Sequence, residues 1–126
     1  MKFQPDSLAG TNTISRHEPG AVWVNGVRWG RSVLVPWRGA VQPWPPAALD
    51  ALTEGHFAQV LALRPEVVLF GSGERLHFVG PALYRELIRA RIGFETMDTA
   101  AACRTYSVLA SEGRSVVAAL LLPACG

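Results

Sequence analysis

The chain has 126 residues, of which 49% are hydrophobic and 17% charged, and its formal net charge is +2. With a mean hydropathy of +0.19, these values are typical of one compact globular domain and exclude a disordered chain. The small net charge gives no support for nucleic-acid binding.

The chain start and the cysteines bear on location and redox chemistry. The first ten residues, MKFQPDSLAG, contain no apolar core of a signal peptide. The longest nearly apolar run, Val116 to Cys125, is shorter than the ~20 residues of a membrane span. Cys103 and Cys125 lack the spacing of a zinc site or redox pair. We therefore expect a soluble, cytoplasmic protein without a metal or cofactor.

The first third of the chain predicts short strands. Residues 1–20 are polar and are predicted to form an extended lead-in. Asn25-Gly26 is a strong hairpin signal, because both residues of a type I′ turn need positive φ. Residues 21–24 and 27–29 should therefore pair as antiparallel strands. A third strand is predicted over residues 32–35 and ends at a proline.

The middle of the chain is rich in proline. Four prolines lie between positions 36 and 46, which excludes a continuous helix or a central strand there. Residues 47–53 and 57–63 each predict a short helical segment. Residues 67–70 form a continuous apolar run, as expected of a strand that is buried on both faces.

The C-terminal half alternates strands and helices. Pro81 and Gly93 bracket a helix, in which Leu83, Leu87 and Ile88 share one face. Residues 94–97 predict a strand, 99–110 a second helix and 115–122 a last buried strand. This order predicts an α/β domain, with the N-terminal hairpin added to a mixed sheet whose C-terminal half is βαβαβ.

The helix over residues 99–110 carries the most unusual composition, with Thr99 as its expected N-cap. At 100° per residue it presents two arcs. The first is a broad, mostly apolar arc that consists of Ala101, Ala102, Thr105, Tyr106, Val108 and Leu109. The second, nearly opposite, is a stripe of small residues that consists of Thr99, Cys103, Ser107 and Ala110. We expect a helix buried on two sides, with Cys103 as a small hydrophobic residue. The alternative is a Cys103 thiolate activated by Arg104 and the helix start.

Gly71-Ser72-Gly73 follows a buried strand, which is where open α/β sheets bind ligands. Asp98 lies 25 positions after Gly73, near the place of the ribose-binding acid of a dinucleotide fold. The third glycine of that fingerprint is missing. Asp98 is equally suitable as a charge at the N-terminus of the next helix.

Glu112-Gly113-Arg114 closes the second helix, with Gly113 expected in the left-handed conformation. A surface ion pair with neighbouring residues is the simpler interpretation. The alternative is that Arg114 joins Arg104 in a small anion-binding patch.

All four tryptophans fall in the N-terminal half of the chain. Trp37 and Trp44 stand beside prolines and are candidates for exposed interface aromatics. The alternative is that they pack onto the sheet as part of the core.

Nearly the whole chain, and residues 67–122 most clearly, resembles a family of small α/β domains. That family includes a mitochondrial assembly factor of respiratory complex I and an adipogenesis-associated cytosolic protein. The residues that carry the resemblance are Gly71-x-Gly73, Asp98-Thr99, Ala102-Cys103, Thr105, Leu109 and Glu112-Gly113-Arg114. Ser107 departs from the asparagine expected in many relatives. The resemblance implies a three-layer α/β domain with a mixed sheet and, for the mitochondrial relative, a role in assembling a membrane complex.

Two functions follow as hypotheses. The first is a non-enzymatic interaction or assembly module, monomeric or weakly self-associating, that binds a protein partner and no nucleic acid. The second is a small-ligand or nucleotide/phosphate-binding protein or enzyme. The candidate site for a ligand or partner consists of Gly71, Ser72, Gly73, Asp98, Thr99, Cys103, Arg104, Ser107, Glu112 and Arg114.

Overall fold

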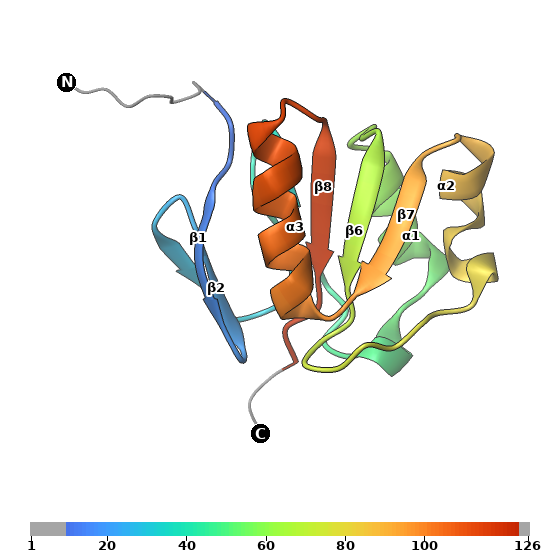
Figure 1. The fold of residues 1–126 in the computed structure, drawn as a ribbon. Coiled ribbons are helices and arrows are strands. Elements are labelled where there is room, and N and C mark those ends of the chain that lie inside the picture. The colour runs from blue at the N-terminus through green and yellow to red at the C-terminus, as the bar shows by residue number, and fades with distance from the viewer. Residues whose placement is uncertain (1–9, 124–126) are drawn as a thin grey trace.

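The computed structural model describes residues 10–123 and contains two β-sheets (Figure 1). The strands are β1 (Ile14–Glu18), β2 (Ala21–Val24), β3 (Val27–Trp29), β4 (Val33–Pro36), β5 (Gln42–Pro43), β6 (Val67–Gly71), β7 (Gly93–Met97) and β8 (Val116–Leu120). The helices are α1 (Glu54–Leu61), α2 (Arg85–Arg89) and α3 (Thr99–Ser111), with 3₁₀ turns at Leu49–Ala51 and Pro81–Tyr84. No helix of the described residues has the length and apolar character to span a membrane.

The larger sheet is mixed, with strand order β5-β4-β8-β6-β7. Strand β6 pairs in parallel with both β7 and β8, and β4 pairs antiparallel with β8. The chain moves from β6 outward to β7 and then back across β6 to β8. Because both crossovers are right-handed, α2 and α3 must cover opposite faces of the sheet. The connections after β6 and β7 therefore diverge at the carboxyl ends of these strands.

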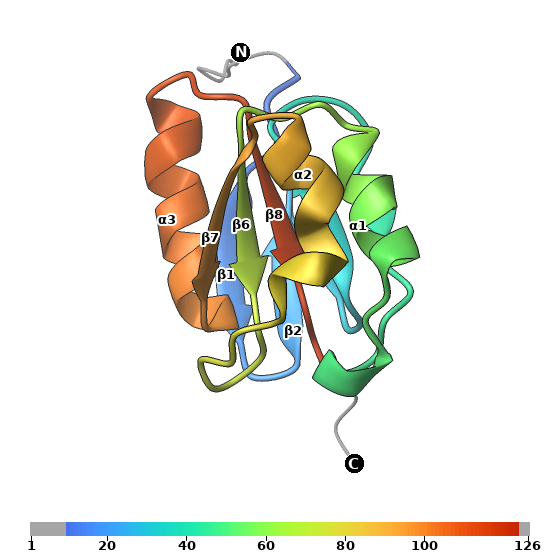
Figure 2. The same cartoon turned by 90° about the vertical axis from the view of Figure 1, so that its right-hand side faces the viewer.

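Three layers result, and the predicted α/β architecture is confirmed (Figures 1 and 2). The small sheet β1-β2-β3 and helix α3 lie side by side on one face of the large sheet, and α1 and α2 lie on the other. Each face has its own buried cluster. Ile14, Val22, Val35, Cys103 and Tyr106 are among the members of the first, and Leu34, Trp44, Phe57, Phe70 and Leu87 of the second.

The lead-in prediction for residues 1–20 is wrong over residues 14–18. These residues form β1, which pairs antiparallel with β2 through a turn at Pro19-Gly20. Only Ile14 of this strand is buried, so the strand is polar and its apolar alternation is too weak to recognise. Residues 1–9 of the predicted lead-in lie outside the described residues.

The helical predictions hold in number but not in extent. The segment at 47–53 is reduced to a single 3₁₀ turn at 49–51. Helix α1 starts at residue 54, earlier than expected, because the backbone N–H of Thr53 donates to His56 Nδ1 in a capping box.

The helix expected between Pro81 and Gly93 is a 3₁₀ turn followed by the five residues of α2. Leu87 is fully buried, whereas Ile88 is 53% exposed. The shared buried face predicted for these two residues is therefore wrong. A helix this short contacts the sheet along a narrow line, and Ile88 lies outside it.

Candidate functional site

The N-terminus of α3 is capped by Asp98, not by Thr99 as predicted. Asp98 Oδ1 accepts a hydrogen bond from the N–H of Ala101 at 2.9 Å. Thr99 is the first helical residue, and its buried hydroxyl is used elsewhere. It donates to the carbonyl of Leu121 and accepts from the N–H of Gly73, both at 2.9 Å. Thr99 therefore joins the glycine loop to the segment after β8.

The Gly71-Ser72-Gly73 loop is shaped by packing. A Cβ on Gly71 would lie 2.9 Å from Thr99 Oγ1 and 3.0 Å from Thr99 Cα, so only glycine fits without displacement. Gly73 adopts φ +109°, which strains any L-residue. The Ser72 hydroxyl donates to the carbonyl of Arg75 and accepts from the N–H of His77. The glycines thus allow β6 to approach α3 closely.

A hollow of about 420 Å³ lies beside this loop, at the carboxyl ends of the strands. The segment after β8 and the turn between β1 and β2 complete its walls. Its lining is formed by His17, Glu18, Pro19, Gly20, Gly73, Glu74, Asp98, Thr99, Ala100, Leu121, Leu122 and Pro123. The sequence interpretation included Gly73, Asp98 and Thr99 but missed the β1–β2 turn. The dipeptide Pro19-Gly20 was the one local signal for that turn.

The hollow offers little to a phosphate. The N–H groups of Gly73 and Thr99 are bonded to Thr99 Oγ1 and the Gly73 carbonyl, and that of Ala101 to Asp98. Three acidic residues, Glu18, Glu74 and Asp98, line the same space. Glu18 is paired with Arg16 and Asp98 caps α3, and the remaining negative charge would repel an anion. The arrangement therefore suits an apolar group that carries a positive charge, and it disfavours the nucleotide alternative.

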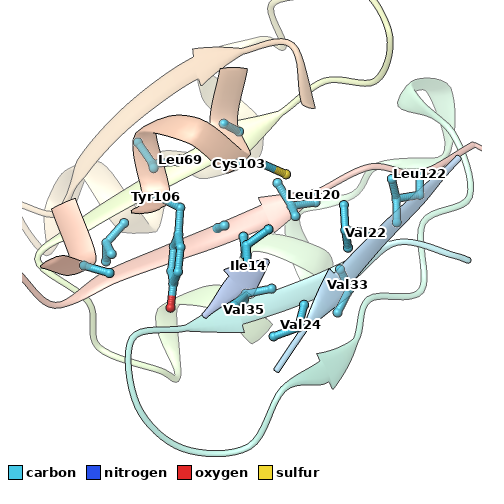
Figure 3. Close-up of a cluster of buried hydrophobic side chains, with 14 of the residues drawn as sticks. Ile14, Val22, Val24, Val33, Val35, Leu69, Cys103, Tyr106, Leu120 and Leu122 are labelled. Atoms are coloured by element: carbon cyan, nitrogen blue, oxygen red, sulfur yellow. The ribbon is translucent and has the colours of Figure 1, made fainter. Parts of the chain in front are cut away.

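Cys103 does not line this hollow. Its side chain is 1% exposed and lies in the cluster between α3 and the large sheet, near Leu120 (Figure 3). Burial raises the pKa of the thiol to about 12, and the opposing charge of Arg104 has a smaller influence. Arg104 itself is exposed. Cys103 is therefore buried as a small hydrophobic residue, as predicted, and its surroundings disfavour an activated thiolate.

The buried face of α3 lies between the two predicted arcs. Its members are Thr99, Ala102, Cys103, Tyr106 and Ala110. Val108, from the predicted apolar arc, is 55% exposed. Ser107, from the small-residue stripe, is exposed and donates only to the carbonyl of Cys103 within the helix. The helix is therefore buried along one continuous face rather than on two opposite sides.

Alkaline pH should destabilise the protein through Cys103. The folded-state pKa of about 12 lies above the ordinary value of 9.0, so between these values the unfolded chain binds fewer protons than the folded one. The free energy of unfolding must then fall as pH rises from about 9 to 12. Burial also raises the pKa of Tyr106, which acts in the same direction. Urea unfolding at stepwise pH measures the slope.

The matched variant for this measurement is Cys103→Ala, which removes the thiol and leaves Tyr106 in place. Its stability should decline less steeply above pH 9 than that of the parent chain. Identical slopes in the two proteins would contradict a buried neutral thiol.

The far end of α3 holds an ion pair. Arg114 Nη2 lies 3.1 Å from Glu66 Oε2, and this hydrogen bond is the largest cause of the lowered pKa of Glu66. Arg114 thus pairs with a neighbour, as the simpler interpretation predicted, and the partner is not Glu112. Arg114 lies beyond the end of α3, and its guanidinium is engaged by Glu66. The structure therefore gives no support to an anion-binding patch of Arg104 and Arg114.

The two candidate interface tryptophans differ. Trp44 is 2% exposed and belongs to the core, so its prediction as an interface residue is wrong. The physical reason is that the prolines turn this segment back over the sheet, beside α1. Trp37 is half-buried, and its indole N–H donates to the carbonyl of Ala110 at 3.2 Å. The guanidinium of Arg38 lies 4.4 Å above its ring.

A buried polar network, which the sequence did not reveal, joins the layers. The Tyr106 hydroxyl lies 2.9 Å from the Asn12 carbonyl and 3.1 Å from the Pro36 carbonyl, within donating distance of both. Asn12 Nδ2 donates to the carbonyls of Pro36 and Gly39, and Asn12 Oδ1 accepts from Asn25 Nδ2. The network fixes the small sheet against α3, and with it the β1–β2 turn that borders the hollow.

Comparison with known proteins gives both a family and structural neighbours. Residues 14–121 match the model of a family described as "Protein of unknown function (DUF498/DUF598)". A crystal structure of a protein from Bordetella parapertussis superimposes with a TM-score of 0.86 at 39% identity, covering 91% of this chain and 98% of that one.

Among the curated relatives are proteins that are named for a role in assembly. The bovine (Bos taurus) NADH dehydrogenase [ubiquinone] 1 alpha subcomplex assembly factor 3 is 35% identical over 82% of this chain and 56% of its own length. An uncharacterised protein of Rhodobacter capsulatus is 34% identical over 96% of this chain and 93% of its own. The chain thus spans about half the length of the assembly factor but nearly all of the bacterial relative. The resemblance predicted from the sequence is confirmed.

Proposed function

Because this chain belongs to the DUF498/DUF598 family, we propose that it is a non-enzymatic protein-binding module that helps to assemble a larger complex. The observation that carries this proposal is the 35% identity to a protein named as a complex I assembly factor. The matching region spans about half of that factor. An assembly role in a larger complex, and binding to a protein partner, are therefore proposed for this chain. A cytoplasmic location is part of the same proposal and can be tested by cell fractionation.

We place the contact with the partner at the hollow of about 420 Å³ between the β1–β2 turn and the start of α3. Leu121, Leu122 and Pro123 give it apolar walls, and carboxylates line it. Protein interfaces commonly place an apolar anchor in such a pocket within a polar rim. A partner side chain with an apolar stem and a cationic end, such as arginine or lysine, fits both features.

Filling the hollow should abolish partner binding. Ala100 is half-buried on the wall, and Ala100→Arg would place a large side chain in the space of the anchor. We expect partner recovery to fall at least about tenfold, equivalent to 1.4 kcal/mol of binding free energy. The measurement is quantitative affinity purification of the tagged full chain at native expression. Val27→Arg, at an exposed residue on β3, is the matched control and should retain the partner.

Two results would contradict this function. The first is a partner that is captured equally by the Ala100→Arg variant and the parent chain. The second is the absence of any partner together with thermal stabilisation of the parent chain by a small cationic compound, lost in Ala100→Arg. The second result would favour the small-ligand alternative, because a volume of this size also accommodates small molecules.

A further inference from the structure

Strand β7 forms an open edge of the large sheet. In Figure 2, which faces this side of the molecule, β7 lies between α3 and α2. The opposite edge, β5, has only two residues and includes Pro43, which prevents strand addition. The small sheet has a three-residue edge at β3 and an irregular register in β1. β7 has five residues without proline and pairs in continuous register with β6.

The outward backbone groups of β7 can be identified from its hydrogen bonds. The N–H of Gly93 donates to Glu66, and the carbonyl of Met97 accepts from Ser72. In a parallel ladder the residues that face one neighbour alternate, so residues 93, 95 and 97 face β6. Phe94 and Thr96 therefore direct their N–H and C=O groups away from the sheet. Outside the strand ladders, the hydrogen bonds found among residues 10–123 use none of these four groups.

The side chains around this edge suit a second strand. Ser107 and Ser111 border a small pocket with β1, so the opposite flank of α3 is turned towards β7. That flank contains Ala101, Thr105 and Leu109, which are half-exposed, and Leu109 also packs against the core. An added strand would cover apolar surface as well as satisfy backbone groups.

Glu95 determines the charge that the added strand needs. It is exposed, lies on the same face of β7 as Met97, and takes part in none of the ion pairs found among the described residues. If two copies of β7 paired antiparallel with all four outward groups bonded, Glu95 would lie directly opposite its own copy. Like charges in that position destabilise a sheet. A lysine or arginine there would be favourable instead.

We propose that β7 accepts an extended basic segment of the protein partner as an added antiparallel strand, with a lysine or arginine opposite Glu95. Phe94 and Thr96 provide the backbone hydrogen bonds, and the half-exposed flank of α3 packs against the added strand. This proposal rests on the protein-binding function proposed above but uses a different surface from the hollow.

The test uses two blocked heptapeptides of alternating threonine and valine, one with a central lysine and the other with a central glutamate. Amide hydrogen exchange and NMR shifts are measured on the full chain. We expect the lysine peptide to slow exchange at Phe94 and Thr96 and to bind several-fold more tightly than the glutamate peptide. Glu95→Lys should reverse this preference, because the charge pair is then inverted.

A backbone variant tests the hydrogen bonds separately. Thr96→Pro removes an outward N–H without removing a bond to β6, and it should lose peptide binding, whereas Thr96→Val should retain it. If Thr96→Pro does not fold, the reversal by Glu95→Lys remains decisive.

Three results would overturn the strand-addition proposal. These are equal binding of the two peptides, peptide-induced shifts confined to β3 or the hollow, and slowed exchange at β7 that depends only on the concentration of the chain itself. The last would show that a second copy occupies the edge. The two proposals can fail separately. If the Ala100→Arg variant no longer recovers the partner but the peptides do not bind to β7, only the strand-addition proposal is overturned and the proposed protein-binding function remains supported.

Discussion

Replacing Trp44 by alanine is expected to lower the free energy of unfolding by about 3–5 kcal/mol. The indole meets Phe57 and Phe70 edge-on, with centroid distances of 5.7 and 6.2 Å. Its N–H also donates to the carbonyl of His56 at 3.1 Å. The variant would leave a cavity and remove the hydrogen bond from the indole to the carbonyl of His56 in α1. Urea unfolding monitored by circular dichroism measures the change.

Trp23→Ala is the matched control for this loss. Trp23 is half-buried on β2, and Arg16 lies 4.4 Å above its ring on the outer side of the small sheet. Its removal opens no cavity in the core, so the loss should be much smaller. Equal losses in the two variants would contradict the assignment of Trp44 to the core.

Asn12→Ala is expected to lower the free energy of unfolding by about 2–3 kcal/mol, because a buried polar group left without its partner costs ~1–3 kcal/mol. The substitution removes the donor to the carbonyls of Pro36 and Gly39. It also removes the acceptor of Nδ2 of Asn25, a residue of the hairpin turn. The same unfolding measurement applies, with loss of protection at the amides of β1 as a second readout.

The neighbouring exposed residue Thr13 provides the control. Its hydrogen bonds use backbone groups: the N–H donates to Asn25 Oδ1, and the carbonyl accepts from the N–H of Asn25. Thr13→Ala should therefore change stability by no more than about 0.5 kcal/mol. An Asn12→Ala variant as stable as Thr13→Ala would show that the network contributes nothing to the docking of the small sheet.

The candidate site was only partly predictable. Gly73, Asp98 and Thr99 do meet at the hollow, because strands that run parallel bring their carboxyl ends to one edge. Cys103 and Arg114 were grouped with them because they lie on or next to the same predicted helix and belong to the family motif. The fold buries the first and pairs the second with Glu66 at the other end of α3. Proximity along a helix surface did not imply a shared site.

Local patterns by themselves determined the hairpin at Asn25-Gly26, the buried strands β6 and β8, and helix α3 within one or two residues. Positive φ in a tight turn, continuous apolar runs and helical spacing all act between residues that are close in the chain. The family resemblance could likewise be recognised from the amino-acid sequence alone.

Only the tertiary structure decided which side of α3 is buried, that Thr99 links the glycine loop to Leu121, and that β1 joins the small sheet. Tyr106 bonds a carbonyl 94 positions away, and Trp37 one 73 positions away. Such contacts form because a buried hydroxyl or indole N–H must find an acceptor once water is excluded. Which acceptor lies within reach depends on how the layers pack, and no short stretch of sequence records that arrangement.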